Sequence, residues 1–525
     1  MSRRLLLRLG GIFLLCGASL LFVSVSLATS AQTIPQVLPS TVNQGAAASA
    51  VLSYSIYLPS IVRSGGPFPN CRLGIGQGGQ SGYDVSPLYM GWYLDWQAVI
   101  TPTRPNQAEY VQVIRLHPAF GGYTFSPPTS TLYAIMTANP GATWLIGNEP
   151  DSPFQDNLVP EEYARAYHDL YALIKNYDPT AKVGAGGIVQ PTPIRLQYLD
   201  RVWAAYLDMY GQPLSADLWN IHSYILREIT PDDPQACQAG GCTEPPYSVW
   251  GAYIPPGFSA TRGILYKYSG QDNLAIFQQR IVDFRTWMRD HGQHDKPLLI
   301  AEYGILFPED YFDEKGAPFS PARAAAFMRA TFDFFLNTRD ASIGDPLDGD
   351  RLVQRWAWYS LNDTNFGGAL FDPLTHARRL LGDAYATYAS QITPSIDLSV
   401  AHAYGDPVVL NPVAQSVTAA LHATFSNQGN FSVNQPVTVT FWDGLPGAGS
   451  MIGGPQVVTR ALAGCGDAGT VSVNWAMLGA GLHPYYVEVD AAHTILESVE
   501  GNNIALGQVL IATHRIYLPL IKRSP

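Results

Sequence analysis

Between residues 70 and 390, short continuous apolar runs alternate with segments whose apolar residues recur at helical spacing. Continuous apolar runs are typical of strands buried on both faces, as in a parallel sheet. The predicted strands span residues 72–76, 90–95, 111–116, 143–147, 182–188, 218–222, 298–302 and 355–360. The predicted helices span residues 160–176, 193–210, 273–291 and 321–338. This alternation predicts an α/β domain, a (β/α)8 TIM barrel, over residues 70–392, with the weakest pattern at 117–142.

Polar and apolar residues alternate one by one from residue 396 onward, and Gly, Pro and Asn separate the alternating stretches, among them 437–442, 470–475 and 483–490. Such alternation is typical of an antiparallel sheet with one buried face, so it predicts a β-sandwich over residues 396–511. The segments Phe425-Ser-Asn-Gln-Gly-Asn430 and 489–503 resemble the bacterial cell-adhesion-related domain called CARDB. That resemblance implies an accessory, immunoglobulin-like module rather than a catalyst.

Residues 1–31 have the pattern of an export signal. Arg3, Arg4 and Arg8 form a basic start, residues 10–28 are apolar, and small residues follow. A run of this length also suits an uncleaved anchor, because about 20 apolar residues span a bilayer. Either alternative predicts an exported protein, secreted or held at the cell surface.

A short motif that contains Ile-Tyr-Leu-Pro occurs at residues 56–64 and again at 516–524. The first copy lies in a predicted linker, residues 32–69, and the second lies in a C-terminal segment, residues 512–525. The two copies resemble apolar-basic tags at the ends of some exported bacterial proteins. An edge strand at each end is the alternative, and the sequence leaves both open.

The formal net charge of −11 argues against nucleic acid as a partner, because phosphates are bound by clustered Lys and Arg. A negative field also slows the approach of strongly acidic polymers. The expected partner is therefore neutral. Aromatic residues make up 12% of the chain, which suits both core packing and stacking on sugars. Neither a cofactor nor a metal is predicted.

Four cysteines follow the signal segment. Cys237 and Cys242 are separated by Gln-Ala-Gly-Gly, a flexible stretch that lets them close a small loop, so we predict a disulfide between them in an exported protein. A metal site is the alternative, but no neighbouring His or Cys pair completes the ligands. Cys71 and Cys465 are far apart and fall in different predicted domains, so they are left unpaired.

Two glutamates stand where a predicted strand opens into a loop. Glu149 ends the strand in Trp144-Leu-Ile-Gly-Asn-Glu-Pro150, and Glu302 ends the strand in Leu299-Ile-Ala-Glu-Tyr-Gly304. The carboxyl ends of barrel strands carry the active site in this fold. Hydrolysis of a glycosidic bond needs one carboxylic acid and one carboxylate, with about 5 Å between them when configuration is retained. The pair therefore predicts a glycosidase site.

Asn148-Glu149-Pro150 and Glu302-Tyr303-Gly304 resemble the clan of retaining (β/α)8 glycoside hydrolases that includes many cellulases, mannanases and β-1,3-glucanases. The resemblance implies that Glu149 is the acid/base and Glu302 the nucleophile. It also implies that Asn148 hydrogen-bonds the sugar 2-hydroxyl.

Further residues complete the predicted substrate site. His222-Ser-Tyr224 is similar to the clan's His-x-Tyr stretch, in which the Tyr hydroxyl orients the nucleophile. Trp358 aligns with the clan's sugar platform, since an aromatic face stacks on a pyranose. Arg115 is either a cation near the nucleophile or a structural ion pair. Trp92 is left between a sugar subsite and core packing.

Three residues near the strand ends have open roles. Asp95 and Trp96, like Trp92, suit a subsite or the core equally. Asp151 follows the acid/base closely and would raise its pKa as a like charge, although a solvated loop aspartate is the simpler interpretation.

The sequence therefore predicts a retaining glycoside hydrolase, endo-acting on a neutral β-linked polysaccharide such as a β-glucan, that works by double displacement with the two glutamates. The expected partner is a polysaccharide or oligosaccharide substrate. A transglycosylase would use the same residues. A catalytically inactive carbohydrate-binding or adhesion protein is the other alternative, and it has no need to keep both glutamates. Association with the cell surface would come through the C-terminal domain or an uncleaved N-terminal segment.

Overall fold

A six-stranded parallel sheet runs through the first part of the chain in the computed structural model, which describes residues 68–230, 251–410, 413 and 415–514. Its order is β3-β2-β1-β12-β11-β8, and all neighbours are parallel. The strands are β1 (Asn70–Gly76), β2 (Met90–Leu94), β3 (Glu109–Tyr110), β8 (Trp219–His222), β11 (Leu298–Tyr303) and β12 (Arg355–Trp358). Predicted strands 72–76, 90–95, 218–222, 298–302 and 355–360 are confirmed.

A second sheet has the order β5-β4-β6-β7. Its strands are β4 (Gln112–Ala119), β5 (Gly122–Ser126), β6 (Thr143–Ile146) and β7 (Lys182–Ala185). The pairs β4–β6 and β6–β7 are parallel, which confirms the other predicted strands. The antiparallel hairpin of β4 and β5 was not predicted, and it occupies part of the weakly patterned stretch. Parallel bridges Gly184–Leu218 and Ile188–Ile221 connect the β7 side of this sheet to β8.

The helices are α1 (Thr129–Ala138), α2 (Pro160–Tyr177), α3 (Pro193–Tyr210), α5 (Leu274–Asp290), α6 (Pro321–Asn337) and α7 (Leu380–Ser390). Short segments between them are the 3-10 helices η1 (Ser86–Leu88), η2 (Pro105–Gln107), η4 (Tyr268–Gly270) and η5 (Pro346–Asp348), and the strands β9 (Arg227–Ile229) and β10 (Gly251–Tyr253). Helix starts follow local chemistry: the Asn273 side chain accepts from the Ile276 N–H, and Ser320 accepts from the Arg323 N–H. The four predicted helices are confirmed.

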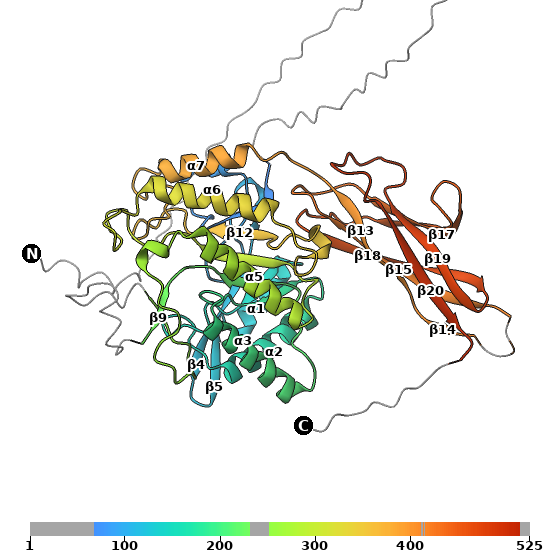
Figure 1. The fold of residues 1–525 in the computed structure, drawn as a ribbon, viewed down its shortest axis with the longest axis horizontal. Coiled ribbons are helices and arrows are strands. Elements are labelled where there is room, and N and C mark those ends of the chain that lie inside the picture. Colours follow the sequence, from blue (N-terminus) through green and yellow to red (C-terminus); the bar gives the residue numbers. More distant parts are fainter. Residues whose placement is uncertain (1–67, 231–250, 411–412, 414, 515–525) are drawn as a thin grey trace, which may run out of the picture. The chain divides into compact units, whose positions relative to one another are not determined.

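The described residues between 398 and 512 form strands and no helix (Figure 1). One sheet has the order β13-β15-β18, from β13 (Leu398–Gly405), β15 (Val417–Asn427) and β18 (Asp467–Leu478). The other has the order β14-β20-β19-β16-β17, from β14 (Val408–Val409), β16 (Val437–Asp443), β17 (Ser450–Val458), β19 (Gly481–Val489) and β20 (Ile504–Ala512). Apart from the parallel pair β14–β20, the pairings are antiparallel. The three predicted strands of this region are confirmed.

Separate groups of buried apolar side chains lie under the two parts of the chain. In residues 73–389 one group joins side chains of the strands and the helices, and a second, smaller group includes Val113, Leu145 and Leu299 from the other face of the strands. Those of residues 398–511 come from inward-facing positions such as Val437, Val439 and Phe441. The structure therefore confirms a mixed α/β fold with parallel and antiparallel sheets. The closed (β/α)8 barrel, the immunoglobulin-like sandwich and the domain boundaries stay predictions.

Several predicted features lie outside the described residues: the export signal, both Ile-Tyr-Leu-Pro copies, and the Cys237–Cys242 disulfide. In the part of the chain that the structure describes, no helix combines the length and apolar character needed to cross a membrane.

A disulfide joins Cys71 and Cys465, across 394 positions of sequence, so leaving these cysteines unpaired was wrong. The fold brings them together because β1 lies against a loop of the C-terminal region: the Cys71 N–H donates to the Asn430 carbonyl at 3.3 Å. The next residue, Arg72, is buried and donates to Asp348 Oδ2 at 2.7 Å and to the Gln428 carbonyl at 2.8 Å. The disulfide and Arg72 together tie the C-terminal region to β1.

We expect the Cys71→Ser/Cys465→Ser double variant to unfold at lower temperature. A disulfide that closes a long loop stabilises a protein by about 2–4 kcal/mol, mainly by restricting the unfolded chain. Differential scanning calorimetry should show the loss, and wild type scanned in reducing buffer should match the double variant. An unchanged transition would mean that the cross-link adds no stability.

Candidate active site

Glu149 lies in a tight turn after β6. Gly147 has φ +92°, and a Cβ on it would come within 3.3 Å of Leu116, Asp156 and Tyr163, so the turn needs glycine here. Glu149 itself has φ +46°, a left-handed conformation that is uncommon outside glycine. Its N–H donates to the Gly187 carbonyl at 2.9 Å. The turn thus holds the Glu149 backbone in one unusual conformation.

Asp156 anchors the start of this turn. One carboxylate oxygen accepts from the N–H groups of Asn148 at 2.7 Å and Leu116 at 3.0 Å. The other oxygen accepts from Arg115 Nε at 2.7 Å. Arg115 therefore forms the structural ion pair, one of its two predicted alternatives, and its bonds go to Asp156 and Gln155 rather than to Glu302. Asn148 is buried, and its amide lies 3.4 Å from the Gln155 side-chain oxygen.

Asp151 is buried and ion-paired, so its interpretation as a solvated loop residue was wrong. It binds Arg195, which comes from the first turn of α3 and is also fully buried. Arg195 Nε in turn lies 2.9 Å from Glu228 Oε1 on β9. Sequence reasoning missed Arg195 and Glu228. The available signal was Arg195, a charged residue at an inward position near the start of a predicted helix. It could have indicated a buried ion pair, because buried charges are almost always paired.

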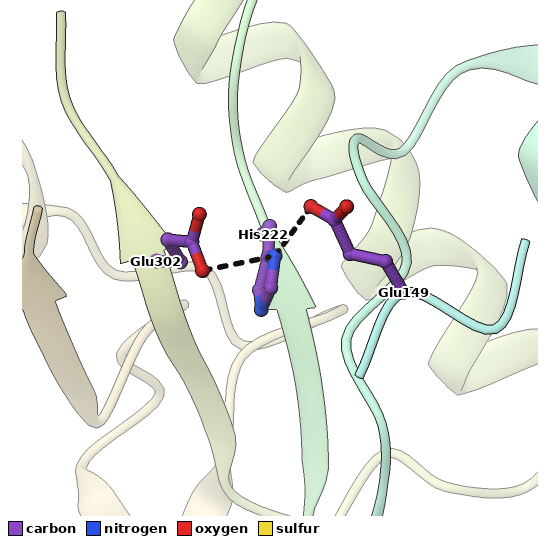
Figure 2. A group of neighbouring side chains, drawn as sticks. All are labelled: Glu149, His222 and Glu302. Carbon is purple, nitrogen blue, oxygen red and sulfur yellow. Dashed lines mark hydrogen bonds and ion pairs between the residues drawn. The ribbon is translucent and has the colours of Figure 1, made fainter. Parts of the chain in front are cut away.

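His222 lies between the two predicted catalytic carboxylates (Figure 2). Its Nδ1 is 2.8 Å from Glu149 Oε1 and 3.7 Å from Glu302 Oε2. One ligand-type atom from each of the three side chains lies within 4.8 Å of the other two. The sheet explains the contact with Glu302, because His222 and Glu302 are direct partners in the β8–β11 pairing. The structure therefore brings the two glutamates to one site.

The Tyr224 hydroxyl donates to Glu302 Oε1 at 2.8 Å, the contact that the His-x-Tyr resemblance predicted. Tyr224 is buried, and the neighbouring Ser223 N–H donates to the Glu302 carbonyl at 3.0 Å. These bonds hold both the side chain and the backbone of Glu302.

Burial raises the pKa of Glu302, and the charge of Glu149 adds to the rise. His222 and the Tyr224 hydroxyl oppose it, because both favour the charged carboxylate. For His222, burial acts against protonation, but the charge of Glu302 and the hydrogen bond and charge of Glu149 leave its pKa raised. A protonated His222 between two carboxylates reduces their mutual repulsion.

Trp358 is fully buried, so its prediction as the sugar platform was wrong. Its Nε1 donates to the Gly368 carbonyl at 2.8 Å. Alternate residues of a strand share a face, and Trp356, two positions earlier, packs on Phe332 and Phe335, the latter with ring centroids 4.9 Å apart. Trp358 thus points into the same helix-covered core.

Trp92 is also fully buried, so of its two predicted roles the structure supports core packing rather than a sugar subsite. Its Nε1 donates to the Arg72 carbonyl at 3.4 Å, and the Arg355 guanidinium lies 4.8 Å from the ring centroid. Two partly exposed aromatic residues near Glu302 are Trp96 and Tyr359, with ring centroids 5.6 Å apart. The sequence left Trp96 open and did not single out Tyr359.

Glu149, His222 and Glu302 are residue types that also bind divalent cations, and their spacing would allow one ion between them. In the structure, His222 Nδ1 and Glu149 Oε1 are hydrogen-bonded to each other. A metal ion bound through these two atoms would displace that hydrogen bond. The contact observed between His222 and Glu149 suits the transfer of a proton.

Solved structures similar to this chain include two glucanases. A GH128 (subgroup II) endo-β-1,3-glucanase from Sorangium cellulosum is 16% identical, with a TM-score of 0.37 over 61% of this chain and 98% of that chain. A GH128 (subgroup I) endo-β-1,3-glucanase from Amycolatopsis mediterranei, in complex with laminaritriose, is 16% identical, with a TM-score of 0.36 over 61% and 99%. The CARDB domain of a Pyrococcus furiosus protein is 20% identical, with a TM-score of 0.18 over 22% and 90%.

The chain matches no curated protein. Residues 77–230 match the family model described as the glycosyl hydrolase catalytic core. This segment holds Asn148, Glu149, His222 and Tyr224, whereas Glu302 lies beyond it. The chain therefore resembles the glycosyl hydrolase catalytic core, as its Asn-Glu-Pro motif predicted.

Proposed function

We propose that this protein is an exported, retaining glycoside hydrolase with Glu149 as acid/base and Glu302 as nucleophile. The observation that carries the proposal is the approach of the two carboxylates, whose nearest ligand-type oxygens lie within 4.8 Å of each other beside His222. Retaining glycosidases hold their carboxyl groups about 5–5.5 Å apart, whereas inverting enzymes need about 6.5–9.5 Å to admit a water.

In the first step, the Glu302 carboxylate attacks the anomeric carbon, the glycosidic C–O bond breaks, and Glu149 donates its proton to the leaving oxygen. In the second step, Glu149 takes a proton from water, the water oxygen bonds to the anomeric carbon, and the bond to Glu302 breaks. Tyr224 keeps Glu302 Oε1 hydrogen-bonded, so Oε2 is the oxygen that remains for attack. His222 is hydrogen-bonded to Glu149 Oε1, so Glu149 Oε2 is the oxygen left to carry the transferred proton.

The strand pairings support the barrel as the scaffold of this site. β12 pairs with β1, β7 bridges to β8, and β3 leads directly into β4, so the parallel strands follow one another around both sheets. Glu149 and Glu302 stand at or just past the carboxyl ends of β6 and β11, where barrel enzymes carry their active sites.

Export and the substrate class are inferred from sequence pattern, net charge, the disulfide and the exposed aromatic residues. The basic and apolar N-terminal sequence and the Cys71–Cys465 disulfide both suit an oxidising compartment outside the cytoplasm. The net charge of −11 and the aromatic pair Trp96 and Tyr359 favour a neutral glycan over an acidic one. We propose a β-linked polysaccharide such as a β-glucan as the substrate, with cell-surface association through the C-terminal region or an uncleaved N-terminal segment.

Reducing-sugar release from a panel of β-1,3- and β-1,4-glucans, mannans, xylans and galactans tests the substrate. We expect release from at least one neutral β-glucan, and no loss of rate in EDTA, because no step uses a metal. Activity on none of the polymers would favour the inactive binding protein, and activity abolished by EDTA and restored by a divalent cation would contradict the two-carboxylate mechanism.

Glu149→Gln and Glu302→Gln should each lower turnover by about 1,000-fold or more, because each removes a group that makes or breaks a bond. Azide should restore the Glu149→Ala variant on a substrate with an activated leaving group, and NMR should show a product of retained configuration. Glu161→Gln, an exposed glutamate on α2, is the matched control. Near-normal turnover by Glu302→Gln, or an inverted product, would show the assignment to be wrong.

His222→Gln should move the acid limb of the kcat/KM profile to higher pH. His222 favours the ionised form of Glu302, so its loss raises the Glu302 pKa further, and the nucleophile is protonated earlier as the pH falls. A pH–rate profile with His402→Gln, an exposed histidine of β13, as control would measure the shift. An acid limb that stays in place would mean that His222 does not influence the nucleophile.

A further inference from the structure

Trp96 follows β2 and lies beside the nucleophile because of the strand order. β2 pairs with β1, β1 with β12, and β12 with β11, which carries Glu302. The carboxyl ends of these neighbours bring Trp96, Gly76, Tyr359 and Glu302 to one edge of the sheet. A Cβ on Gly76 would lie 3.1 Å from Trp96 Cη2 and 3.5 Å from Tyr359 Cδ2, so glycine leaves room for both rings.

Two features of Trp96 are unfavourable without a function. Its backbone has φ +53°, which for a bulky residue is a true conformational outlier. Its buried indole Nε1 has no hydrogen-bond partner of ordinary geometry among the described residues. Strained backbone and unsatisfied buried donors both gather where a protein binds a ligand or performs chemistry.

The Glu302 carboxylate is a candidate acceptor for this indole N–H. Trp96 acts on Glu302 as a hydrogen-bond donor does, since it lowers the pKa of that carboxyl together with Tyr224. A bond to Glu302 would satisfy the buried donor that the structure leaves without a partner.

The Tyr359 ring packs beside the Trp96 ring. Its hydroxyl donates to Asp363 Oδ2 at 2.8 Å, which holds the ring, and its pKa is raised by burial and by the nearby charges of Glu302 and Asp363. Trp96 and Tyr359 are both partly exposed. Their rings therefore form an open aromatic wall next to the nucleophile.

We propose that Trp96 is a positioning residue for Glu302 and that, with Tyr359, it forms the wall of the pyranose subsite on the nucleophile's side. The indole N–H donates to the ionised carboxylate and aims it at the anomeric carbon, while the ring stacks on the C–H face of the sugar. This inference rests on the proposed function, and it replaces the platform role that buried Trp358 cannot fill.

Trp96→Phe keeps a ring and removes the N–H. We expect kcat to fall about 10- to 100-fold, as when one preorganised donor is lost. The acid limb of kcat/KM should move to higher pH, because the ionised nucleophile loses a donor. Trp96→Ala should in addition raise KM, since the stacking surface is gone. Trp203→Phe, the same change on the outer helix α3, should alter none of these values.

A measurement that needs no turnover separates the positioning role from the proposed function. In 15N-tryptophan-labelled protein, the indole signal that Trp96→Phe removes should titrate with Glu302 and stop titrating in Glu302→Gln. A Trp96→Phe variant with wild-type kcat and acid limb, or a Trp96 signal that ignores Glu302, would overturn the inference. If instead the wild type cleaves no glycan while the titration is seen, the proposed function fails and the contact with Glu302 stands.

Discussion

Two carboxylates held within 4.8 Å of each other, and largely withdrawn from water, are the constraint on which the site depends. Like charges so placed repel, and burial raises the pKa of Glu302. His222 relieves this because its Nδ1 faces both. Its position in turn requires Gly187, where a Cβ would lie 2.6 Å from His222 Cδ2. Gly187 thus leaves room for His222, which reduces the repulsion between Glu149 and Glu302.

The two glutamates are held by different means. Glu302 lies in strand β11, directly after a shift in the pairing register that follows Ile300. The Tyr224 hydroxyl holds its side chain. Glu149 lies in a strained turn, which hydrogen bonds to Asp156 and the buried Asp151–Arg195 pair stabilise. Removing one partner of a buried ion pair leaves an uncompensated charge, so this support is stiff. A catalytic pair needs such stiffness, because small displacements weaken transition-state contacts.

The C-terminal region is attached to the strand system rather than only to the end of the chain. Cys71 and Arg72 lie in β1, between β2 and β12, and both contact C-terminal residues. Lys182, at the start of β7, adds an ion pair to Asp467 at 3.0 Å. These contacts involve the amino ends of the strands, whereas Glu149 and Glu302 stand at the carboxyl ends. The cross-links therefore join the C-terminal region to the opposite ends of the strands from the two glutamates.

The sequence by itself determined most of the strands and helices and singled out the two glutamates, because apolar periodicity and the Asn-Glu-Pro motif are local properties of the chain. Tertiary structure alone decided the rest. Trp358 faces the core and Trp96 packs beside Tyr359 because strand pairing and packing place each ring. Cys71 meets Cys465 because two distant segments pack together. Asp151 is buried because α3 supplies Arg195, and no pattern within one segment records which distant charge will arrive to pair with it.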